Sequence, residues 1–282
     1  MSISKKTIFA VLFALIVCVS MFPAIAHAQS NDISFKKILN ARDLGGFKTA
    51  DGKTVKSGVI LRTGELAYAS AGDITKLQNT YKVKRVFDFR YSTDHKYCPD
   101  KAIPGATNVN LPTKYKKSPS AKTPKERYKA QKDLSAKKLL KKAIPTFKKV
   151  KKDYTYALVM DSYSQKQYKK YFDYLLQNKD ANCLLFHCIH GKDRTGVAAY
   201  MTLIALGVSE KDAYNDYIAT NTYLKAVNPS AYKTGNIGVT GSDLKYAVSK
   251  AKKKYGSMSK FLESAYGLDA NDINTLKSIY TY

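Results

Sequence analysis

The chain has 282 residues, of which 44% are hydrophobic and 12% aromatic, and this composition excludes a largely disordered protein. Its 48 lysines and arginines against 22 acidic residues give a formal net charge of +26, which favours anionic partners or surfaces without bearing on the fold. Four cysteines are too few for a disulfide scaffold, and no Cys-x-x-Cys or His-Glu-x-x-His motif occurs, so we expect neither a metal site nor a cofactor.

Residues 1–28 have the features of a secretory signal peptide. Lys5 and Lys6 precede an apolar run from Ile8 to Phe22, which is followed by Ala26-His27-Ala28. A basic start, a short apolar stretch and an Ala-x-Ala end predict cleavage after Ala28 and an exported protein, secreted or extracytoplasmic. The alternative is an uncleaved anchor, because the segment is close to the ~20 residues that span a bilayer.

Strand and helix signals alternate over residues 29–282, which predicts one α/β domain with a mostly parallel central sheet flanked by helices. The predicted strands are, in chain order, Gly58–Arg62, Arg85–Arg90, Thr107–Leu111 and Cys183–His187. Helical spacing is shown by Ile74, Leu77 and Tyr81, by Tyr168, Phe172, Leu175 and Leu176, and by Val197, Met201 and Ile204. The C-terminal region predicts two or three more short helices, separated at Gly256 and Gly267.

The stretch Lys114–Lys152 contains sixteen lysines or arginines and only two acidic residues. Its apolar residues have partial helical spacing, so we expect a helical insertion. Three interpretations are open: a lid over a site, a docking surface for an anionic membrane or cell-wall polymer, or a solvated insertion. The stretch lacks the regular aromatic residues on which nucleic-acid bases stack, and we expect no nucleic-acid partner.

Three cysteines remain after cleavage, Cys98, Cys183 and Cys188, and an odd number implies at least one free thiol. If Cys183–His187 is a strand, the Cα atoms of Cys183 and Cys188 lie ~16 Å apart. A disulfide requires less than about 7 Å. Cys188 is therefore expected to be free unless Cys98 pairs with it.

The segment His187-Cys-Ile-His-Gly-Lys-Asp-Arg-Thr-Gly196 lies between a predicted strand and a predicted helix, an arrangement that binds anions. The free N–H groups and the positive end of the helix dipole point to the loop, and Gly191 allows loop N–H groups to turn inward. Arg194 offers a planar fork for two phosphate oxygens. Together with Lys192, these groups favour the thiolate of Cys188, which can attack a bound phosphorus atom in line.

Two other interpretations account for this segment less well. A nucleotide-binding P-loop requires glycine five residues before the Gly-Lys pair and serine or threonine after it, but Phe186 and Asp193 occupy those positions. A buried cysteine at a strand end followed by a helix cap explains Cys188 alone. It does not explain Arg194 at the sixth position after the cysteine with Thr-Gly following.

The spacing of Cys188 and Arg194, with five residues between them, resembles the signature of protein-tyrosine phosphatases. The whole segment from His187 resembles that of a bacterial subgroup of secreted tyrosine phosphatases that also act on serine phosphate and phosphoinositides. Further similar blocks occur in the same order, from Asn40 to the C-terminal helices: Asn40–Gly46, Leu61–Leu66, Asp88–Arg90, Gly207-Val208 with Asp216-Tyr217, and Tyr255–Ser257 with Phe261-Leu262.

The resemblance implies roles for the residues of the loop. It implies Cys188 as the nucleophile and Arg194 as the phosphate clamp, with Thr195 donating a hydroxyl hydrogen bond to the sulfur. It also implies that His187 orients the loop and that Lys192 adds charge suited to polyanionic headgroups. The remaining substrate-binding positions are those of the loop backbone, Ile189, His190 and Gly191.

The general acid departs from the pattern of related enzymes, which carry an aspartate after a strand that ends in Leu-Pro. Here Leu111-Pro112 is followed by Thr113 and no acidic residue until Glu126. Asp193, within the loop, is therefore the preferred proton donor. Asp88 and Asp94 are the other candidates for the general acid. Asp88, however, is expected to pair with Arg42 or Arg62.

The expected function is a metal-independent phosphatase that acts on phosphotyrosine through a phosphocysteine intermediate. Phosphoserine, phosphothreonine and phosphoinositides are expected as possible additional substrates. One alternative is an inositol polyphosphate phosphatase, and another is a non-catalytic protein that binds phosphate polymers at the cell envelope. Cys188 favours an enzyme, because a protein that only binds phosphate needs no nucleophile.

Overall fold

The computed structural model describes residues 31–113, 152–227 and 238–282. The predicted signal peptide and all of the Lys-rich stretch except Lys152 lie outside the described residues, so the expectations for both segments remain predictions. Among the helices that are described, none combines the length and the apolar character needed to cross a membrane.

Six strands form one sheet in the order β1-β2-β3-β6-β4-β5. Their bounds are Asn31–Asp32, Arg42–Asp43, Ile60–Thr63, Arg85–Asp88, Thr107–Asn110 and Leu184–His187 for β1 to β6. β3, β6, β4 and β5 are parallel neighbours, whereas β1 and β2 add an antiparallel edge. The four predicted strands and the mostly parallel sheet are confirmed. The two edge strands were not predicted, because two residues are too few to show an alternating pattern.

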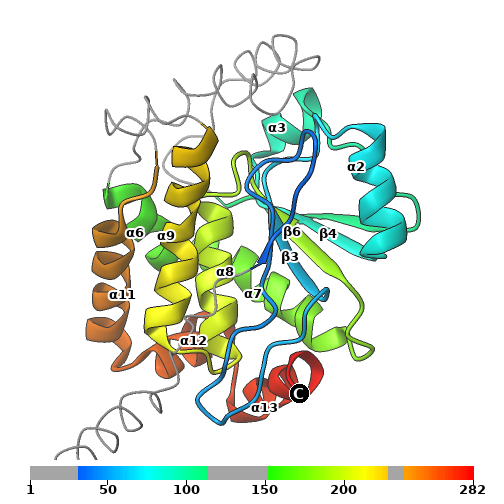
Figure 1. Cartoon of the computed structure of the whole chain (residues 1–282). Coiled ribbons are helices and arrows are strands. Elements are labelled where there is room, and N and C mark those ends of the chain that lie inside the picture. The colour runs from blue at the N-terminus through cyan, green and yellow to red at the C-terminus, as the bar shows by residue number, and fades with distance from the viewer. Residues whose placement is uncertain (1–30, 114–151, 228–237) are drawn as a thin grey trace, which may run out of the picture.

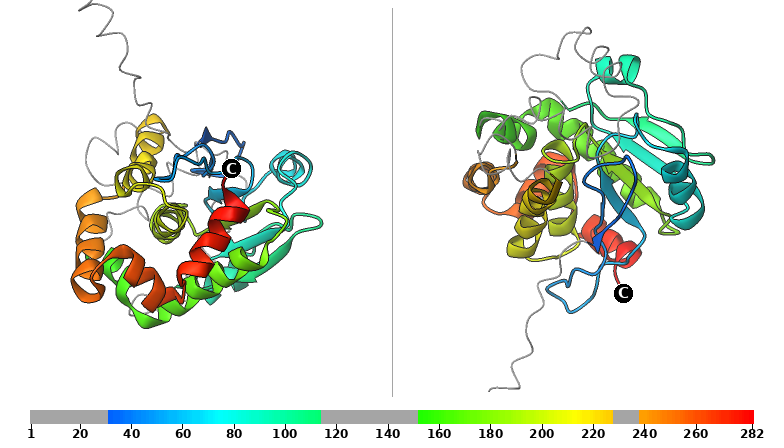
Figure 2. Two further views of the ribbon diagram at one scale, coloured as in Figure 1. Left: turned by 90° about the horizontal axis from the view of Figure 1, so that it is seen from below. Right: turned by 45° about the horizontal axis from the view of Figure 1, so that its top comes forward.

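The helices cover the two faces of the sheet unequally (Figures 1 and 2). Their bounds are Ala71–Thr75 (α2), Lys76–Thr80 (the π-helix η1), Ser92–Tyr97 (α3), Lys152–Met160 (α6), Ser162–Gln177 (α7), Arg194–Ala205 (α8), Glu210–Val227 (α9), Gly241–Tyr255 (α11), Met258–Tyr266 (α12) and Ala270–Tyr280 (α13). α2 and η1 lie on one face, and the larger group that includes α7 and α8 lies on the other. The predicted helices around Leu77, Phe172 and Met201 are therefore confirmed as η1, α7 and α8.

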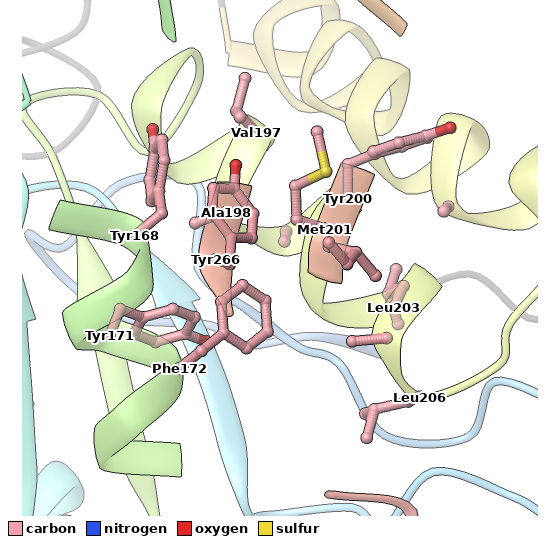
Figure 3. Close-up of a cluster of buried hydrophobic side chains, with 14 of the residues drawn as sticks. Tyr168, Tyr171, Phe172, Val197, Ala198, Tyr200, Met201, Leu203, Leu206 and Tyr266 are labelled. Carbon is pink, nitrogen blue, oxygen red and sulfur yellow. The ribbon is translucent and has the colours of Figure 1, made fainter. Parts of the chain in front are cut away.

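The alternation of side chains along the strands explains the two layers of core. In β6, Leu185 joins Leu77 of η1 in the smaller cluster, while Leu184 and Phe186 join the larger one. In the larger cluster, α7 contributes Tyr168, Tyr171 and Phe172, which face Val197, Ala198 and Met201 of α8 with Tyr266 between them (Figure 3). These aromatic residues are core residues, as their helical spacing predicted.

The C-terminal region folds as α11, α12 and α13, with boundaries at the two predicted glycines. Gly256 and Gly267 cap α11 and α12 with φ angles of +91° and +70°. Such angles are readily adopted only by glycine. α11 lies farthest from the sheet in Figure 1, so these helices extend the larger layer outward.

Candidate active site

The loop between β6 and α8 lies at the carboxyl end of the parallel strands, where α/β proteins commonly bind ligands. β6 ends at His187 and α8 begins at Arg194, so residues 188–193 form the loop. Cys188 is the first residue of the loop and is nearly buried. Cys188, Cys98 and Cys183 are all free thiols, as predicted for Cys188. Burial, followed by the charge of Asp43, raises the pKa of Cys183 to about 12, so that thiol is not reactive.

Three consecutive carbonyl groups of the loop point toward the N-terminal part of the chain. The backbone N–H of Glu65 donates to the carbonyl of Ile189 at 3.0 Å. The side-chain amide of Asn40 donates to the carbonyls of His190 at 3.2 Å and of Gly191 at 2.9 Å. Because C=O and N–H point in opposite directions across a trans peptide, the next three N–H groups turn away from this block. This orientation is what an anion cradle requires.

Gly191 is the residue that allows the loop to pass so close to β3. Its φ angle is +63°, in the left-handed region. A Cβ atom at this position would lie 2.6 Å from both the carbonyl carbon and the oxygen of Thr63. The φ angle and the close approach both favour glycine here, while the role of Gly191 in turning loop N–H groups inward stays a prediction.

A buried group of charges braces the loop from below. Arg62 donates through Nη2 to the carbonyl of Gly191 at 2.8 Å and through Nη1 to Asp216 of α9. Arg42 places its Nε 3.5 Å from the same carboxylate and donates to Thr220 at 3.3 Å. The partner of Arg42 and Arg62 is thus Asp216, and the prediction that Asp88 pairs with one of them is wrong.

Asp88 belongs to a second buried network, centred on Arg90. The guanidinium of Arg90 lies 2.7 Å from Asp88, 2.8 Å from Asp100 and 2.9 Å from Glu65. Asp88 and Arg90 are two residues apart at the end of β4, which makes this local pair easier to form than one with Arg42 or Arg62. Burial opposes ionisation of Asp88, but Arg90 and His187 outweigh it and hold its pKa well below the usual range.

His187 joins the Arg90 network to the loop. Its Nε2 lies 3.0 Å from Asp100 and its Nδ1 donates to the carbonyl of Cys188 at 3.1 Å. Burial alone would lower its pKa, but Asp100 and Asp88 raise it to about 9, so the ring is an imidazolium at neutral pH. The geometry agrees with a role in orienting the loop.

Asp88, Asp100 and His187 are also the one group among the described residues with ligand-type atoms close enough for a metal ion, within 4.8 Å of one another. Arg90 already pairs with both carboxylates, and His187 is protonated there. A metal ion requires a neutral imidazole and free carboxylate oxygens. The group therefore fits a structural ion network better than a metal site.

Arg194 is held by groups from three separate segments. Its Nη1 donates to the carbonyl of Phe89 at 3.2 Å, and its Nε donates to the hydroxyl of Tyr154 in α6 at 2.9 Å. Its guanidinium carbon lies 4.6 Å from the centre of the Tyr91 ring. Tyr168 donates to the backbone carbonyl of Arg194 at 3.1 Å. Sequence reasoning did not assign these three tyrosines to the site, since no motif surrounds Tyr154 and the spacing of Tyr168 indicates a core residue.

The other predicted loop residues lie where the sequence placed them, but their side chains differ in exposure. Lys192 is buried, donates to the carbonyl of Gly238 at 3.2 Å and lies 3.6 Å from Asp193. Asp193 retains 14% side-chain exposure, and burial raises its pKa although Lys192 and Arg194 oppose the shift. The Thr195 hydroxyl is buried and makes no hydrogen bond to the described residues, so the expected bond to Cys188 is absent in this state.

The candidate acids outside the loop are both buried. Asp88 is committed to Arg90 and His95. Asp94 lies in α3, where its charge contributes to raising the pKa of Arg194, although burial is the larger and opposing influence. After β5, Thr113 donates its N–H to the carbonyl of Phe89, which Arg194 also contacts. The segment that follows β5 therefore does approach the site, with threonine where related enzymes place an acid.

Comparison with known proteins identifies the family. A sequence model of the tyrosine phosphatase family matches residues 33–282. A protein of Cupriavidus necator, provisionally named a tyrosine-protein phosphatase, is 30% identical over 220 residues, which cover 74% of this chain and 70% of the relative. A tyrosine-protein phosphatase of Nostoc commune is 36% identical over 63 residues, which cover 22% of this chain and 21% of that protein. The chain therefore belongs to the tyrosine phosphatase family and is a protein-tyrosine phosphatase.

Proposed function

We propose that the protein hydrolyses phosphotyrosine through a phosphocysteine intermediate on Cys188. The observation that carries the proposal is the loop geometry, in which Glu65 and Asn40 hold three consecutive carbonyls while Arg194 is fixed at the start of α8. The thiolate of Cys188 attacks phosphorus, an S–P bond forms, and the P–O bond to the leaving group breaks. Water then attacks phosphorus, the S–P bond breaks, and the thiolate and inorganic phosphate are released.

Asp193 is the proton donor in this proposal. A general acid must be protonated near the working pH, and burial shifts the pKa of Asp193 in that direction. Its Oδ1 is buried and makes no hydrogen bond to the described residues, so no protein group among them competes for the proton. The carboxyl group gives its proton to the leaving oxygen in the first step and recovers one from the attacking water in the second. Asp88 is a poor candidate, because Arg90 and His187 keep it ionised.

Phosphoserine, phosphothreonine and phosphoinositides are proposed as additional substrates, on the basis of the resemblance of the whole loop. Lys192 was expected to contact polyanionic headgroups; its side chain is buried in this structure and donates to the carbonyl of Gly238. We further propose that the chain is exported, with cleavage after Ala28, and that its basic surface contacts anionic membrane or cell-wall polymers.

The test is phosphate release by residues 29–282 under reducing conditions with a chelator present. We would compare a phosphotyrosine peptide, a phosphoserine peptide, phosphoinositides and inositol hexakisphosphate, with Cys188→Ser as the control. Turnover of the phosphotyrosine peptide that is lost in Cys188→Ser supports the cysteine mechanism. A higher turnover on inositol hexakisphosphate points to the inositol polyphosphate alternative. Phosphate binding without turnover on any substrate would leave a binding protein and refute the proposal.

Phosphocysteine formation has its own test. Rapid quenching of the reaction with acid should trap phosphate on a fraction of the wild-type chains, up to one per chain, and on a larger fraction of the Asp193→Asn chains if slower breakdown limits turnover. A wild-type reaction that proceeds without any trapped phosphoenzyme, even at short times, would argue for direct attack by water.

A further inference from the structure

Tyr154 contacts the phosphate-binding arginine from a helix that contains none of the recognised motifs. We propose that Tyr154 is a positioning residue, which acts through Arg194 and fixes the edge of the guanidinium that binds phosphate. The expected effect of Tyr154 on catalysis rests on the proposed function. The test of the proposal by phosphate binding, however, does not depend on turnover.

The contacts of Arg194 divide its hydrogen-bond donors into two groups. The single hydrogen on Nε is used by the hydroxyl of Tyr154 at 2.9 Å, and Nη1 donates to the carbonyl of Phe89 at 3.2 Å. Nη2 makes no hydrogen bond within the part of the chain that the structure describes. The edge formed by Nη1 and Nη2 is therefore the one with donors left for a pair of phosphate oxygens, because each Nη carries two hydrogens.

Tyr154 is itself held in place by the packing of α6. Leu158 and Val159 on this helix are fully buried in the larger core cluster. Tyr156 packs its ring against Tyr246 of α11 at 6.0 Å between centroids. The Tyr154 hydroxyl therefore reaches Arg194 from a fixed helix, and little freedom of that side chain is left to lose when phosphate binds.

The surroundings of Tyr154 keep its hydroxyl neutral. Burial raises the pKa of this phenol well above its ordinary value, although the charge of Arg194 acts in the opposite direction. A neutral phenol accepts the Nε hydrogen without cancelling the positive charge that phosphate needs. A carboxylate in its place would form a salt bridge with Arg194 and compete with the substrate for it. A neutral tyrosine therefore suits the position next to Nε of Arg194 better than an acidic residue would.

Two arrangements make opposite predictions for loss of the hydroxyl. If Tyr154 holds Arg194 in the orientation that binds phosphate, Tyr154→Phe weakens phosphate binding. If phosphate instead displaces Tyr154 from Nε, the hydroxyl competes with the ligand, and Tyr154→Phe strengthens binding. The proposal requires the first result, by about tenfold or more, the effect expected for loss of a hydrogen bond to a charged group.

The experiment measures inorganic phosphate binding by titration calorimetry in the Cys188→Ser background, with and without Tyr154→Phe. Tyr171→Phe is the matched control, because Tyr171 is a fully buried tyrosine on α7 whose hydroxyl pairs with Thr202 at 3.2 Å, away from Arg194. We expect a weaker Kd for Tyr154→Phe and an unchanged Kd for Tyr171→Phe. Unchanged or tighter binding in Tyr154→Phe overturns the proposal, whether or not the protein has phosphatase activity.

A double-mutant cycle separates positioning from general destabilisation. Arg194→Lys removes the Nε donor, so Tyr154→Phe should cause no further loss of kcat/KM on an aryl phosphate in that background. A loss of the same size in both backgrounds would mean that Tyr154 supports only the fold, and it would overturn the proposal. Urea unfolding of each variant confirms that the compared proteins are folded.

Discussion

Asp216→Asn tests whether the buried charges beneath the loop are essential to both fold and activity. Asp216 and Arg62 are fully buried, Arg42 is 2% exposed, and both arginines direct a nitrogen to the Asp216 carboxylate. The substitution keeps the shape of the side chain but leaves two buried guanidinium groups without a negative partner. Breaking a buried ion pair from one side costs about 3–5 kcal/mol. For a chain of this size, that cost corresponds to a decrease in Tm of about 6–20 °C.

The effect should also reach the catalytic loop. Arg62 holds the carbonyl of Gly191 through Nη2, and Asp216 fixes Arg62 through Nη1. Once the carboxylate is lost, Arg62 is free to move toward solvent and release the loop. We therefore expect kcat/KM on an aryl phosphate to fall at least tenfold at a temperature where Asp216→Asn is still folded.

Asp173→Asn provides the matched control for charge removal. Asp173 pairs with Lys169 at 2.7 Å on the exposed face of α7, where both side chains are more than a third exposed. Exposed pairs of this kind contribute about 0–1 kcal/mol, and solvent screening favours the lower end. Urea and thermal unfolding of both variants decide the question. If Asp216→Asn is no less stable than Asp173→Asn, the ion group around Asp216 does not brace the loop.

Three further predictions concern the loop and its support. Asp193→Asn should lower kcat by about a hundredfold on phosphoserine and by less on p-nitrophenyl phosphate, and equal losses on both substrates would exclude Asp193 as the acid. Wild-type activity should fall as pH rises through the raised pKa of Asp193, and this fall should be absent in the variant. His187 binds a proton in the folded state up to about pH 9 and in the unfolded state only up to about 6.5, so its stabilising contribution is complete below pH 6.5 and lost by pH 9. The change is on the order of 3 kcal/mol in urea unfolding, and His187→Gln should be flatter over that range. Gly191→Ala places a Cβ atom 2.6 Å from Thr63 and should destabilise the protein by about 1–3 kcal/mol with loss of phosphate binding, which calorimetry would detect.

The parts of the fold that sequence reasoning predicted are those in which local pattern and burial agree. β6 is central in the sheet, so its residues Leu184–His187 are all buried and read as a continuous apolar run before a polar loop. α7 and α8 each show one apolar face at helical spacing, and Figure 3 shows those faces in contact. The loop between β6 and α8 was predictable because its chemistry is contained in ten consecutive residues.

The support of the loop was not predictable in the same way. Asn40, Arg62, Asp216 and Tyr154 are separated from the loop by between 23 and 148 residues along the chain, and only the topology brings them to it. The Asn40 block was recognised through its resemblance to the family, but no spacing within the sequence indicated which carbonyl its amide would meet. Asp88 shows the limit most clearly, since several arginines of suitable charge were available and only the structure selects Arg90.

The two buried ion networks, around Asp216 and around Arg90, hold different parts of the loop. Arg62 and Asn40 hold the carbonyl side at Gly191, while the imidazolium of His187 holds the carbonyl of Cys188 from the Arg90 network. Each network buries both signs of charge, with one positive charge in excess around Asp216 and one negative charge in excess around Arg90. The donors are already oriented before the substrate binds, and little reorganisation is left for the transition state.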